Sequence, residues 1–530
     1  MKKFVGLLLA LCVSVSTVAL TGCKPKVSDT EQTLEVFVLD AGYGSQWCRD
    51  LLDLFKEQDW VKEKYPDLQI VFSHNDVTSY GASKLEAGAR SNTIDLFCDA
   101  FTQEYGGPNG QLENLTESVY NSTVPGETVK WIEKATPSYT VSNRYIDVAN
   151  PDAEDSWYVT SWASGMCGIL YNESMLTRYG LDVPRTTNEL LDVCAALKTH
   201  GKYSFVQAKD ETYWAYLHDI WWAQYEGISR YIDFWNGVDN GEYSVDIFKQ
   251  RGKEETLKVY EDLLKYSKGY LNPSSFTYGF MQAQTLFLQG ETAAFNVNGD
   301  WFDNEMRSIY NEIKAENNGE IDTFKMMRTP IVSALGTKLG IDDATLSALV
   351  AYVDGEGEKP TVTSTKNYTE AQIIEAVKEA RTVVYSIGPN HKCCIPKYAN
   401  GKQVAIDFLR FMATDIAQEQ YIKTTGGATL PFNYNVKEKN PTLYNSFSDL
   451  QKSRLDYFFA DTYDVYTLPA VYSFPLARYG ELTANISERY YETFSANGNT
   501  KTAHDFYQET IDNWTESKWN MALVRAGISA

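Results

Sequence analysis

Strand-like and helix-like segments alternate over residues 34–99, and this alternation limits the fold more than any other feature. Leu34–Leu39, Leu68–Phe72 and Ile94–Asp99 are short apolar runs that predict strands. Apolar residues recur at helical spacing between the first two runs, at Trp47, Leu51, Leu54 and Phe55. The third run is continuously apolar, which suits a parallel sheet covered on both faces. The chain is therefore expected to belong to the α/β class.

Two later segments predict amphipathic helices with recognisable ends. Thr186 and Glu189 have the spacing of a capping box just before an apolar helical face. Lys402–Ile422 places its apolar residues on one face and is followed by Gly426 and Gly427, a pair that suits a helix C-terminus. With 530 residues and 43% hydrophobic content, the chain is long enough to form two or more lobes.

The first 23 residues have the composition of an export signal. Two lysines precede an apolar run that ends in Leu20-Thr21-Gly22-Cys23. This ending resembles the lipobox of bacterial lipoproteins, which implies that residues 1–22 are removed and that Cys23 takes up a lipid. Residues 23–33 would then tether the protein to the extracytoplasmic face of the cell membrane. The alternative is an uncleaved transmembrane anchor over residues 4–20, at the short end of what spans a bilayer.

The composition favours some partners and excludes others. A formal charge of -22 argues against nucleic acid, because phosphate binding needs clustered lysine and arginine. Aromatic residues make up 14% of the chain, with 36 Tyr and 12 Trp. Such rings have an apolar face and a polar handle, which suits the C–H surfaces and hydroxyl groups of sugars. The composition therefore favours a carbohydrate ligand, although many of the rings are expected in the core.

The cysteines and histidines show no metal-site spacing. Cys12 lies in the leader and Cys23 is the expected lipid site. Neither the remaining six cysteines nor the five scattered histidines form a paired Cys-x-x-Cys or His pattern. We therefore expect no metal, no cofactor and mostly reduced, buried thiols, although an even number of cysteines in an exported chain also permits disulfides. The six are Cys48, Cys98, Cys167, Cys194, Cys393 and Cys394.

Three blocks of the sequence combine a strand, a helix and a glycine-containing turn. The first extends from Trp157 to Glu189, with the pair Tyr171-Asn172 before a Pro-x-Thr-x-x-Glu helix start. The second, residues 287–301, runs from a helix through a small-residue strand to Gly-Asp-Trp. The third, residues 395–431, is a helix that ends in a glycine turn and a proline. In order and spacing they resemble the sugar-binding group of the extracellular solute-binding proteins of bacterial ABC importers, which includes maltose-binding protein.

This resemblance implies a periplasmic-binding-protein-like (type II) fold with two discontinuous α/β lobes and a hinge between them. We expect residues 34–158 and 300–424 to form the N-terminal lobe and residues 159–299 and 425–530 the C-terminal lobe. The resemblance further implies a monomeric receptor that holds its ligand between the lobes. The length of the chain and its aromatic content favour an oligosaccharide as this ligand. The receptor would deliver this ligand to the membrane permease subunits of an ABC importer.

Four candidate ligand-binding residues follow predicted strands, where loops of α/β lobes bind ligands. Tyr43 lies in a glycine-flanked turn after the first strand, and Asp99 ends the third. Each also has a structural interpretation, as a ring packed on its own lobe or as a helix cap. The family resemblance implies that Trp162 and Trp301 line the cleft, with hinge packing as the alternative.

Five further residues complete the predicted binding site. Asn298 and Asp300 flank the strand end next to Trp301. Trp222 is chosen from a very aromatic segment, residues 213–225, of which at least one ring is expected to reach the cleft. Gly426 and Gly427 would let backbone amides approach a ligand, although a helix stop explains them equally well.

The main alternative function is an exported carbohydrate-active enzyme, such as a glycoside hydrolase. That chemistry needs two carboxylates that flank the scissile bond. Because the chain has 70 acidic residues, a suitable pair could always be chosen. The block order and the absence of a nucleophile elbow or a His-Glu-x-x-His motif favour a binding protein with no catalytic residue. A surface adhesin would predict repeats, and the sequence has none. The identity of the sugar stays open.

Overall fold

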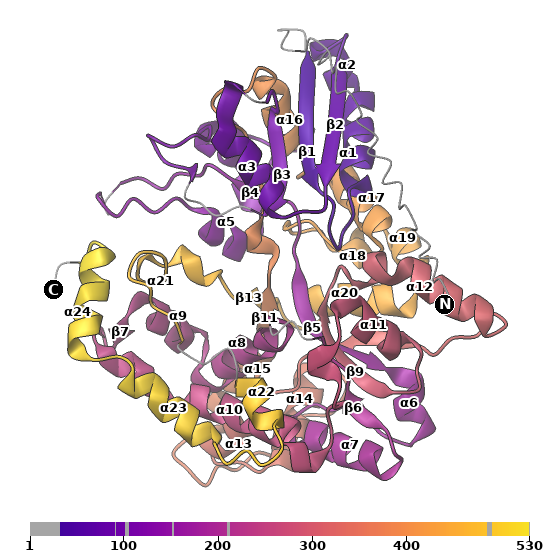
Figure 1. Ribbon diagram of the computed structural model, residues 1–530, viewed down its shortest axis with the longest axis vertical. Coiled ribbons are helices and arrows are strands. Elements are labelled where there is room, and N and C mark those ends of the chain that lie inside the picture. The colour runs from indigo at the N-terminus through magenta and orange to yellow at the C-terminus, as the bar shows by residue number, and fades with distance from the viewer. Residues whose placement is uncertain are drawn as a thin grey trace, which may run out of the picture.

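The computed structural model has two lobes, one above the other in Figure 1, each built around its own sheet. The predicted leader, Cys12 and Cys23 lie outside the described residues. No helix in the described part is long and apolar enough to cross a membrane. The structure describes residues 32–90, 92–100, 105–150, 153–208, 212–484 and 490–528.

The first lobe contains a five-stranded sheet with the order β2-β1-β3-β12-β4. The three predicted strands form its parallel part, and the last two strands run antiparallel to their neighbours. The strands are β1 (Thr33–Leu39), β2 (Gln69–Asn75), β3 (Leu96–Ala100), β4 (Thr160–Ser161) and β12 (His391–Cys394). The helices of this lobe are α1 (Gln46–Glu57), α2 (Asp59–Lys64), α3 (Ser79–Ala87), α4 (Trp131–Lys134), α5 (Pro137–Asn143), α16 (Lys402–Phe411) and α17 (Asp415–Thr425).

The helix predicted over Lys402–Ile422 is two helices, α16 and α17. Thr414 separates them: its Oγ1 accepts a hydrogen bond from the Ala417 amide and so caps α17. A threonine at this position competes with the helix for backbone hydrogen bonds, which starts a new helix instead of extending the first. The expected apolar face is buried in α16, whereas Ile416 of α17, which was expected on that face, is 45% exposed.

The second lobe contains a six-stranded sheet with the order β13-β11-β5-β9-β6, in which β10 also pairs with β5. Its strands are β5 (Met166–Asn172), β6 (Tyr203–Phe205), β9 (Ala293–Gly299), β10 (Phe324–Met327), β11 (Val383–Ser386) and β13 (Tyr466–Thr467), and a separate hairpin joins β7 (Val238–Asp239) and β8 (Glu242–Tyr243). Its helices are α6 (Glu173–Arg178), α7 (Thr187–Thr199), α8 (Thr212–Glu226), α9 (Ile228–Asn236), α10 (Arg251–Leu264), α11 (Phe280–Leu288), α12 (Phe302–Glu316), α13 (Ala334–Leu339), α14 (Asp343–Val353), α15 (Glu370–Thr382) and α20 (Asp449–Phe458). The central β5 is buried along its whole length.

Two predicted lobe boundaries are wrong. We expected the chain to leave the first lobe after residue 158, but β4 (Thr160–Ser161) still pairs with β12 in the first-lobe sheet. We expected the chain to return to the first lobe at residue 300, but β10 and β11 both pair with β5 of the second lobe. The chain re-enters the first lobe only at β12, which pairs with β3 and β4. Residues 300–386 therefore belong to the second lobe. The Gly-Asp-Trp motif ends a strand of this lobe and starts its helix α12, so it does not mark a crossing.

Three chain segments connect the lobes and contact one another where they cross. They are residues 162–165, 387–390 and 426–435. The Ile387 amide donates to the Gly165 carbonyl at 2.9 Å, and the Ser164 amide donates to the Thr429 carbonyl at 2.8 Å. At Gly388 a Cβ atom would lie 2.2 Å from the Ser164 carbonyl oxygen, so the backbones meet without intervening side chains. These crossings form the hinge region between the two sheets.

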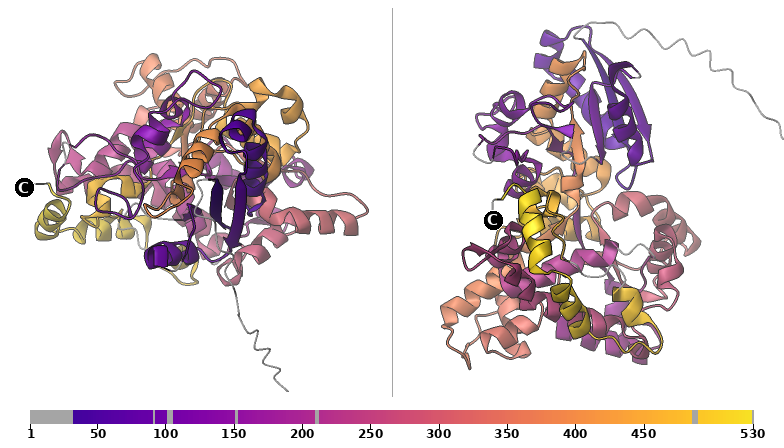
Figure 2. Two further views of the ribbon diagram at one scale, coloured as in Figure 1. Left: turned by 90° about the horizontal axis from the view of Figure 1, so that it is seen from above. Right: turned by 60° about the vertical axis from the view of Figure 1, so that its left-hand side comes forward.

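The C-terminal segment lies along the second lobe and reaches the first. Figure 2 (right) shows its last helix beside the junction of the lobes. The Tyr479 hydroxyl donates to the Ile146 carbonyl at 3.3 Å, and Gly527 packs directly against Val148 of the first lobe. Besides α20, the helices after the third crossing are α18 (Val436–Lys439), α19 (Pro441–Asn445), α21 (Pro475–Arg478), α22 (Tyr490–Ser495), α23 (Ala503–Asp512) and α24 (Glu516–Arg525).

Candidate functional site

Aromatic rings from both lobes meet at the lobe junction. Tyr43, in the turn between β1 and α1, has its ring centroid 5.6 Å from that of Trp162, which follows β4. It also lies 6.1 Å from Trp301 of the second lobe, in an edge-to-face arrangement. On its other side Trp301 contacts Tyr216 of α8 at 6.4 Å. These four residues, with His391 at the start of β12, define the junction cluster.

Trp301 lies between the backbones of two glycines, one from each lobe. A Cβ atom on Gly299 would come within 1.9 Å of the indole ring, and one on Gly42 within 2.7 Å. The ring therefore folds back over the end of its own strand and touches the β1–α1 turn of the first lobe. The side chain of Asn304 strengthens this contact by donating to the Gly42 carbonyl at 2.9 Å.

A hydrogen bond between the lobes accompanies these ring contacts. The Tyr43 hydroxyl donates to the Asp300 carboxylate, with 2.5 Å between the oxygens. Burial raises the pKa of Asp300 to about 6, against the lowering effect of the Tyr43 hydrogen bond and of the nearby Arg454 guanidinium. Burial and the Asp300 charge together raise the pKa of Tyr43 well above its usual value. The carboxyl group thus titrates within the mildly acidic range.

A buried arginine joins this site to the third crossing. Arg454 of α20 donates to the Asp300 carbonyl at 2.7 Å and to the Gly426 carbonyl at 2.5 Å. The predicted role of the glycine pair is not supported, because the amides of Gly426 and Gly427 both donate to the Ile422 carbonyl at the end of α17. Both glycines have positive φ angles, +72° and +101°, and are therefore a helix stop.

Trp162 is covered on both sides. Trp47 stacks on it, with centroids 5.0 Å apart and ring planes 10° apart, and His391 meets it edge-on at 4.7 Å. Its indole nitrogen donates to the Asp99 carbonyl at 3.3 Å. Burial lowers the pKa of His391 to about 4, so this imidazole is neutral at pH 7. The first-lobe side of the junction cluster is thus uncharged and aromatic.

Two predicted ligand residues point away from the cluster. The Asp99 carboxylate lies against Gly81 of α3, where a Cβ atom would come within 1.9 Å of it. Because side chains alternate along a strand, Asp99 faces the α3 side of the sheet together with Phe97. Asn298 is buried, donates to the Asn296 side chain and accepts from the Gly299 amide. Asp99 therefore packs within its lobe, and Asn298 fixes the strand end that carries Trp301.

Trp222 belongs to the core of the second lobe. Its indole nitrogen donates to the Gln250 side chain at 2.9 Å, and its ring packs edge-on against Tyr231 and Phe234. The ring of this aromatic segment that reaches the lobe junction is Tyr216. Six residues along a helix turn the side chain to a different face, so Tyr216 and Trp222 cannot face the same way. The structure thus places Trp222 away from the lobe junction, and Tyr216 is the residue of this segment that contacts Trp301 there.

Sequence reasoning missed four residues around the cluster. Tyr385 of β11 stacks on Tyr216 with centroids 5.4 Å apart, and His391 packs edge-on against Trp162. Helical spacing within residues 213–225 would have identified Tyr216. The other three come from the chain between residues 383 and 454, where the lobe boundary was misplaced or no motif was recognised. Their contacts depend on the strand pairings of this region, which have no local signal in the sequence. The four are Tyr216, Tyr385, His391 and Arg454.

One cavity lies between the lobes. It has a volume of about 720 Å³, and both lobes line it, through Tyr145 and Tyr158 of the first and Asp233, Tyr243 and Leu476 of the second. Its volume falls within the range of small-molecule sites, about 300–1,000 Å³. Aromatic and carboxylate groups together suit a polyhydroxylated ligand.

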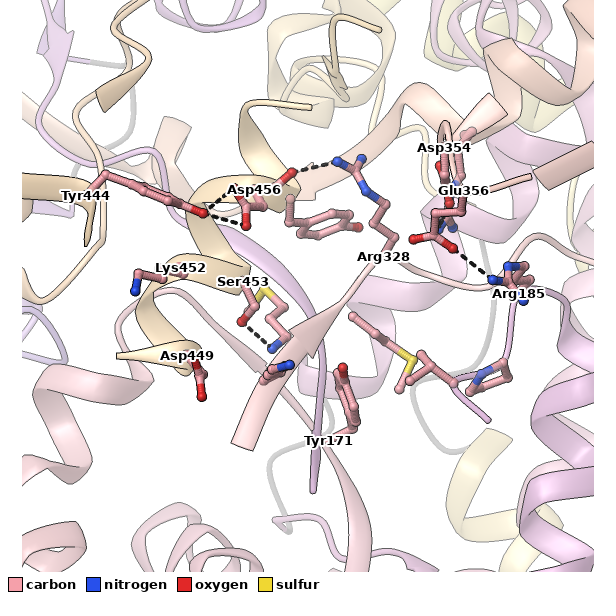
Figure 3. A pocket seen from close by; sticks show the side chains of 17 residues that line it. Tyr171, Arg185, Arg328, Asp354, Glu356, Tyr444, Asp449, Lys452, Ser453 and Asp456 are labelled. Atoms are coloured by element: carbon pink, nitrogen blue, oxygen red, sulfur yellow. Dashed lines mark hydrogen bonds and ion pairs between the residues drawn. The ribbon is translucent and has the colours of Figure 1, made fainter. Parts of the chain in front are cut away.

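A second cavity, of about 410 Å³, lies within the second lobe, and neither cavity is lined by any of the predicted ligand residues. Figure 3 shows charged side chains from several elements around it. Arg185 pairs with Glu356 at 2.8 Å, and Arg381 pairs with Asp354 at 2.7 Å. Because only one lobe lines this cavity, its occupancy would not sense the distance between the lobes.

The sequence matches the profile of the bacterial extracellular solute-binding protein family over residues 49–331, more than half of the chain. The chain belongs to this family. Diacetylchitobiose-binding protein NgcE of Streptomyces coelicolor is 24% identical to it over 279 residues. The match covers 52% of this chain and 54% of NgcE, so the similarity spans about half the length of that relative.

Solved structures share the fold of this chain over most of its length. Maltose-bound MalE3 of T. maritima has a TM-score of 0.55 and 16% identity, and covers 91% of this chain and 98% of its own. A protein from work on xylan utilization by Caldanaerobius polysaccharolyticus has a TM-score of 0.56 and 14% identity, and covers 91% of this chain and 100% of its own. At these identities the likeness shows the fold alone. The expected two-lobed fold is confirmed.

Proposed function

We propose that the protein is a lipid-anchored extracytoplasmic receptor that captures an oligosaccharide between its lobes and delivers it to the permease of an ABC importer. Family membership supports solute binding, and the name of NgcE, a sugar-binding relative, supports carbohydrate. The observation that carries the proposal is the junction cluster, to which each lobe contributes rings and a hydrogen-bonding group. Catalysis is not part of the proposed function.

The two-lobed contact gives this function a physical basis. Tyr43 and Trp162 come from one lobe and Trp301 from the other, so a sugar that contacts both sides of this cluster binds best at one lobe spacing. A ligand with this preference shifts the hinge equilibrium by its difference in affinity for the two states. The spacing of the lobes then becomes the signal that a permease can recognise.

A thermal-shift screen over malto-, xylo- and chito-oligosaccharides tests the sugar class, since a ligand of the folded state raises the melting temperature. For the sugar that binds, Trp301→Ala and Trp162→Ala should each weaken binding at least tenfold, about 1.4 kcal/mol. Tyr266→Ala is the matched control, because this ring is 55% exposed and lies outside the cluster. Unchanged affinity in both tryptophan variants would contradict the assigned site.

Incubation of the same sugars with the purified protein separates binding from the alternative, a glycoside hydrolase. We expect stabilisation without any new reducing ends. Release of shorter sugars at a rate proportional to protein concentration would show that the chain is an enzyme.

The lipid anchor is tested at Cys23. The Cys23→Ala protein should leave the membrane fraction, whereas Cys48→Ala should remain there, because Cys48 is buried in the folded protein. The mass of one chain is 59.9 kDa. Sedimentation of the released protein as a single species near that mass would support a monomer, and a species of twice that mass would contradict it.

A further inference from the structure

Two cysteines far apart in the sequence lie directly opposite each other in the first-lobe sheet. Cys98 of β3 and Cys393 of β12 are register partners in an antiparallel pair. Their sulfur atoms are 3.1 Å apart. Directly opposite residues of antiparallel strands have Cα atoms about 4.5–5.5 Å apart, which falls within the span of a disulfide, about 4.4–6.8 Å. A bond between these two sulfurs therefore needs no rearrangement of the strands.

The neighbouring cysteines are placed differently. Cys394 points to the opposite face of β12 and packs with Phe97 and Tyr158, away from Cys98. Cys48 of α1 lies on the Cys98 side, close enough to interact with that thiol. All of these thiols are buried and free. Cys393 is thus the cross-strand partner of Cys98, while Cys48 is a third thiol on the same side.

We propose that Cys98 and Cys393 are a disulfide-forming pair that becomes covalently linked when the protein folds in an oxidising compartment. The bond joins β12, the strand with which the chain re-enters the first lobe, to β3. Both strands belong to one sheet, so the link stabilises the first lobe without crossing the hinge. It would therefore leave the spacing of the lobes free to change with ligand.

The reaction needs a disulfide oxidant, such as glutathione disulfide or a thiol oxidoreductase. The Cys98 thiol loses its proton and attacks one sulfur of the oxidant, whose disulfide breaks and releases one thiol. The Cys393 thiol then loses its proton and attacks the Cys98 sulfur of the mixed disulfide, which releases the second thiol. The protein loses two electrons and two protons, and the oxidant gains them.

The two thiols react before they are buried. In the folded protein both side chains are fully buried, and burial raises the pKa of each thiol well above its usual value. Burial excludes the oxidant from both sulfurs, and the raised pKa lowers the fraction of each thiol that is present as the reactive thiolate. Oxidation is thus expected during folding, and exposure of the folded, reduced protein to the same oxidant should link the pair far more slowly.

The test uses the full chain, residues 1–530 without the lipid, refolded from denaturant in a buffer of reduced and oxidised glutathione. Free thiols are then alkylated in denaturant, and the protein is digested with trypsin without reductant. Titration should fall by two from the eight cysteines of the chain. Mass spectrometry should find residues 91–130 linked to residues 393–397, and reduction should separate them.

Matched variants identify the sulfurs, because residues 393–397 also contain Cys394. The link should persist in Cys394→Ala and in Cys48→Ala and disappear in Cys393→Ala. If Cys393→Ala fails to fold, fragmentation of the linked peptide from Cys394→Ala gives the same assignment. Eight alkylated cysteines after refolding, or a link from Cys98 to Cys48 or Cys394, would overturn the proposal.

Discussion

At the scale of single residues, the position of Trp301 depends on two residues without side chains. Gly299 and Gly42 let the indole lie against the backbone of both lobes. The motif Gly-Asp-Trp was recognisable in the sequence, and so was its place after a strand. The packing of its ring on Gly42 is a tertiary contact between residues far apart in the sequence, so neither sequence segment alone predicts it.

Replacement of Gly299 by alanine should displace the Trp301 ring, because the new methyl group would lie 1.9 Å from it. Overpacking of this kind costs about 1–3 kcal/mol. Urea unfolding and the tryptophan emission spectrum both report the change. Gly279→Ala is the control, since nothing lies within 4 Å of that position. Equal stability of the two variants would show that the ring is not confined.

Asp300 should make stability depend on pH in the mildly acidic range. Its pKa is raised by burial to about 6 from 3.8, so the folded protein disfavours the ionised form. Relative to Asp300→Asn, the wild type should lose up to about 3 kcal/mol as the pH rises from 3.8 through 6, with no further loss above that. Urea unfolding of both proteins at pH 4, 5, 6 and 7 measures the difference.

The control for this experiment is Asp53→Asn, a change on the exposed face of α1. This variant also removes one carboxylate and gives the baseline for the comparison. A difference between Asp300→Asn and the wild type that does not change with pH would mean that the Asp300 carboxyl does not titrate in the expected range.

At the scale of helices and strands, local patterns were reliable and long-range pairings were not. The apolar runs that became β1, β2 and β3 and the capped start of α7 could be read directly from the sequence. The pairing partners of β10, β11 and β12 could not be read from the sequence, because the residues of a four-residue strand do not specify which strand it pairs with. The misplaced boundary at residue 300 has this cause.

The crossing segments should be intolerant of a side chain at Gly388. A Cβ atom there would lie 2.2 Å from the Ser164 carbonyl oxygen and 2.3 Å from that of Ala163. Backbone atoms cannot move aside cheaply, so Gly388→Ala should cost about 3 kcal/mol or more and change the affinity for the sugar. Asn390→Ala, an exposed position of the same segment, should do neither. Thermal unfolding and titration calorimetry measure the two effects.

Arg454 should contribute strongly to stability, beside the buried apolar residues of helix α20. Its guanidinium donates to the carbonyls of Asp300 and Gly426, and Arg454→Met would leave both buried oxygens without this donor. Loss of such charged hydrogen bonds costs about 3 kcal/mol in total. Lys452→Met on the same helix should have little effect, because the Lys452 ammonium only lies over the Tyr444 ring, 5.9 Å from its centroid. Denaturant midpoints of both variants give the comparison.

At the scale of the whole molecule, neither lobe is a continuous piece of chain. The first sheet needs β12, and the second needs β11 and β13, all of which follow the region that matches the family profile. A fragment of residues 32–331 should therefore lack a cooperative unfolding transition. Circular dichroism during heating tests this, with residues 32–528 as the control. A sharp transition in the shorter fragment would show that the matched region folds alone.

The late arrival of β12 also bears on secretion. Until residues 391–394 have emerged, the hydrogen-bonding edge of β3 that they cover stays open, and its sequence Leu-Phe-Cys-Asp-Ala is largely apolar. An open apolar strand edge is a template for aggregation with other chains. In a chain exported as proposed above, this open edge would persist for most of the passage across the membrane, and a chaperone that covers it on the far side would raise the yield of folded protein.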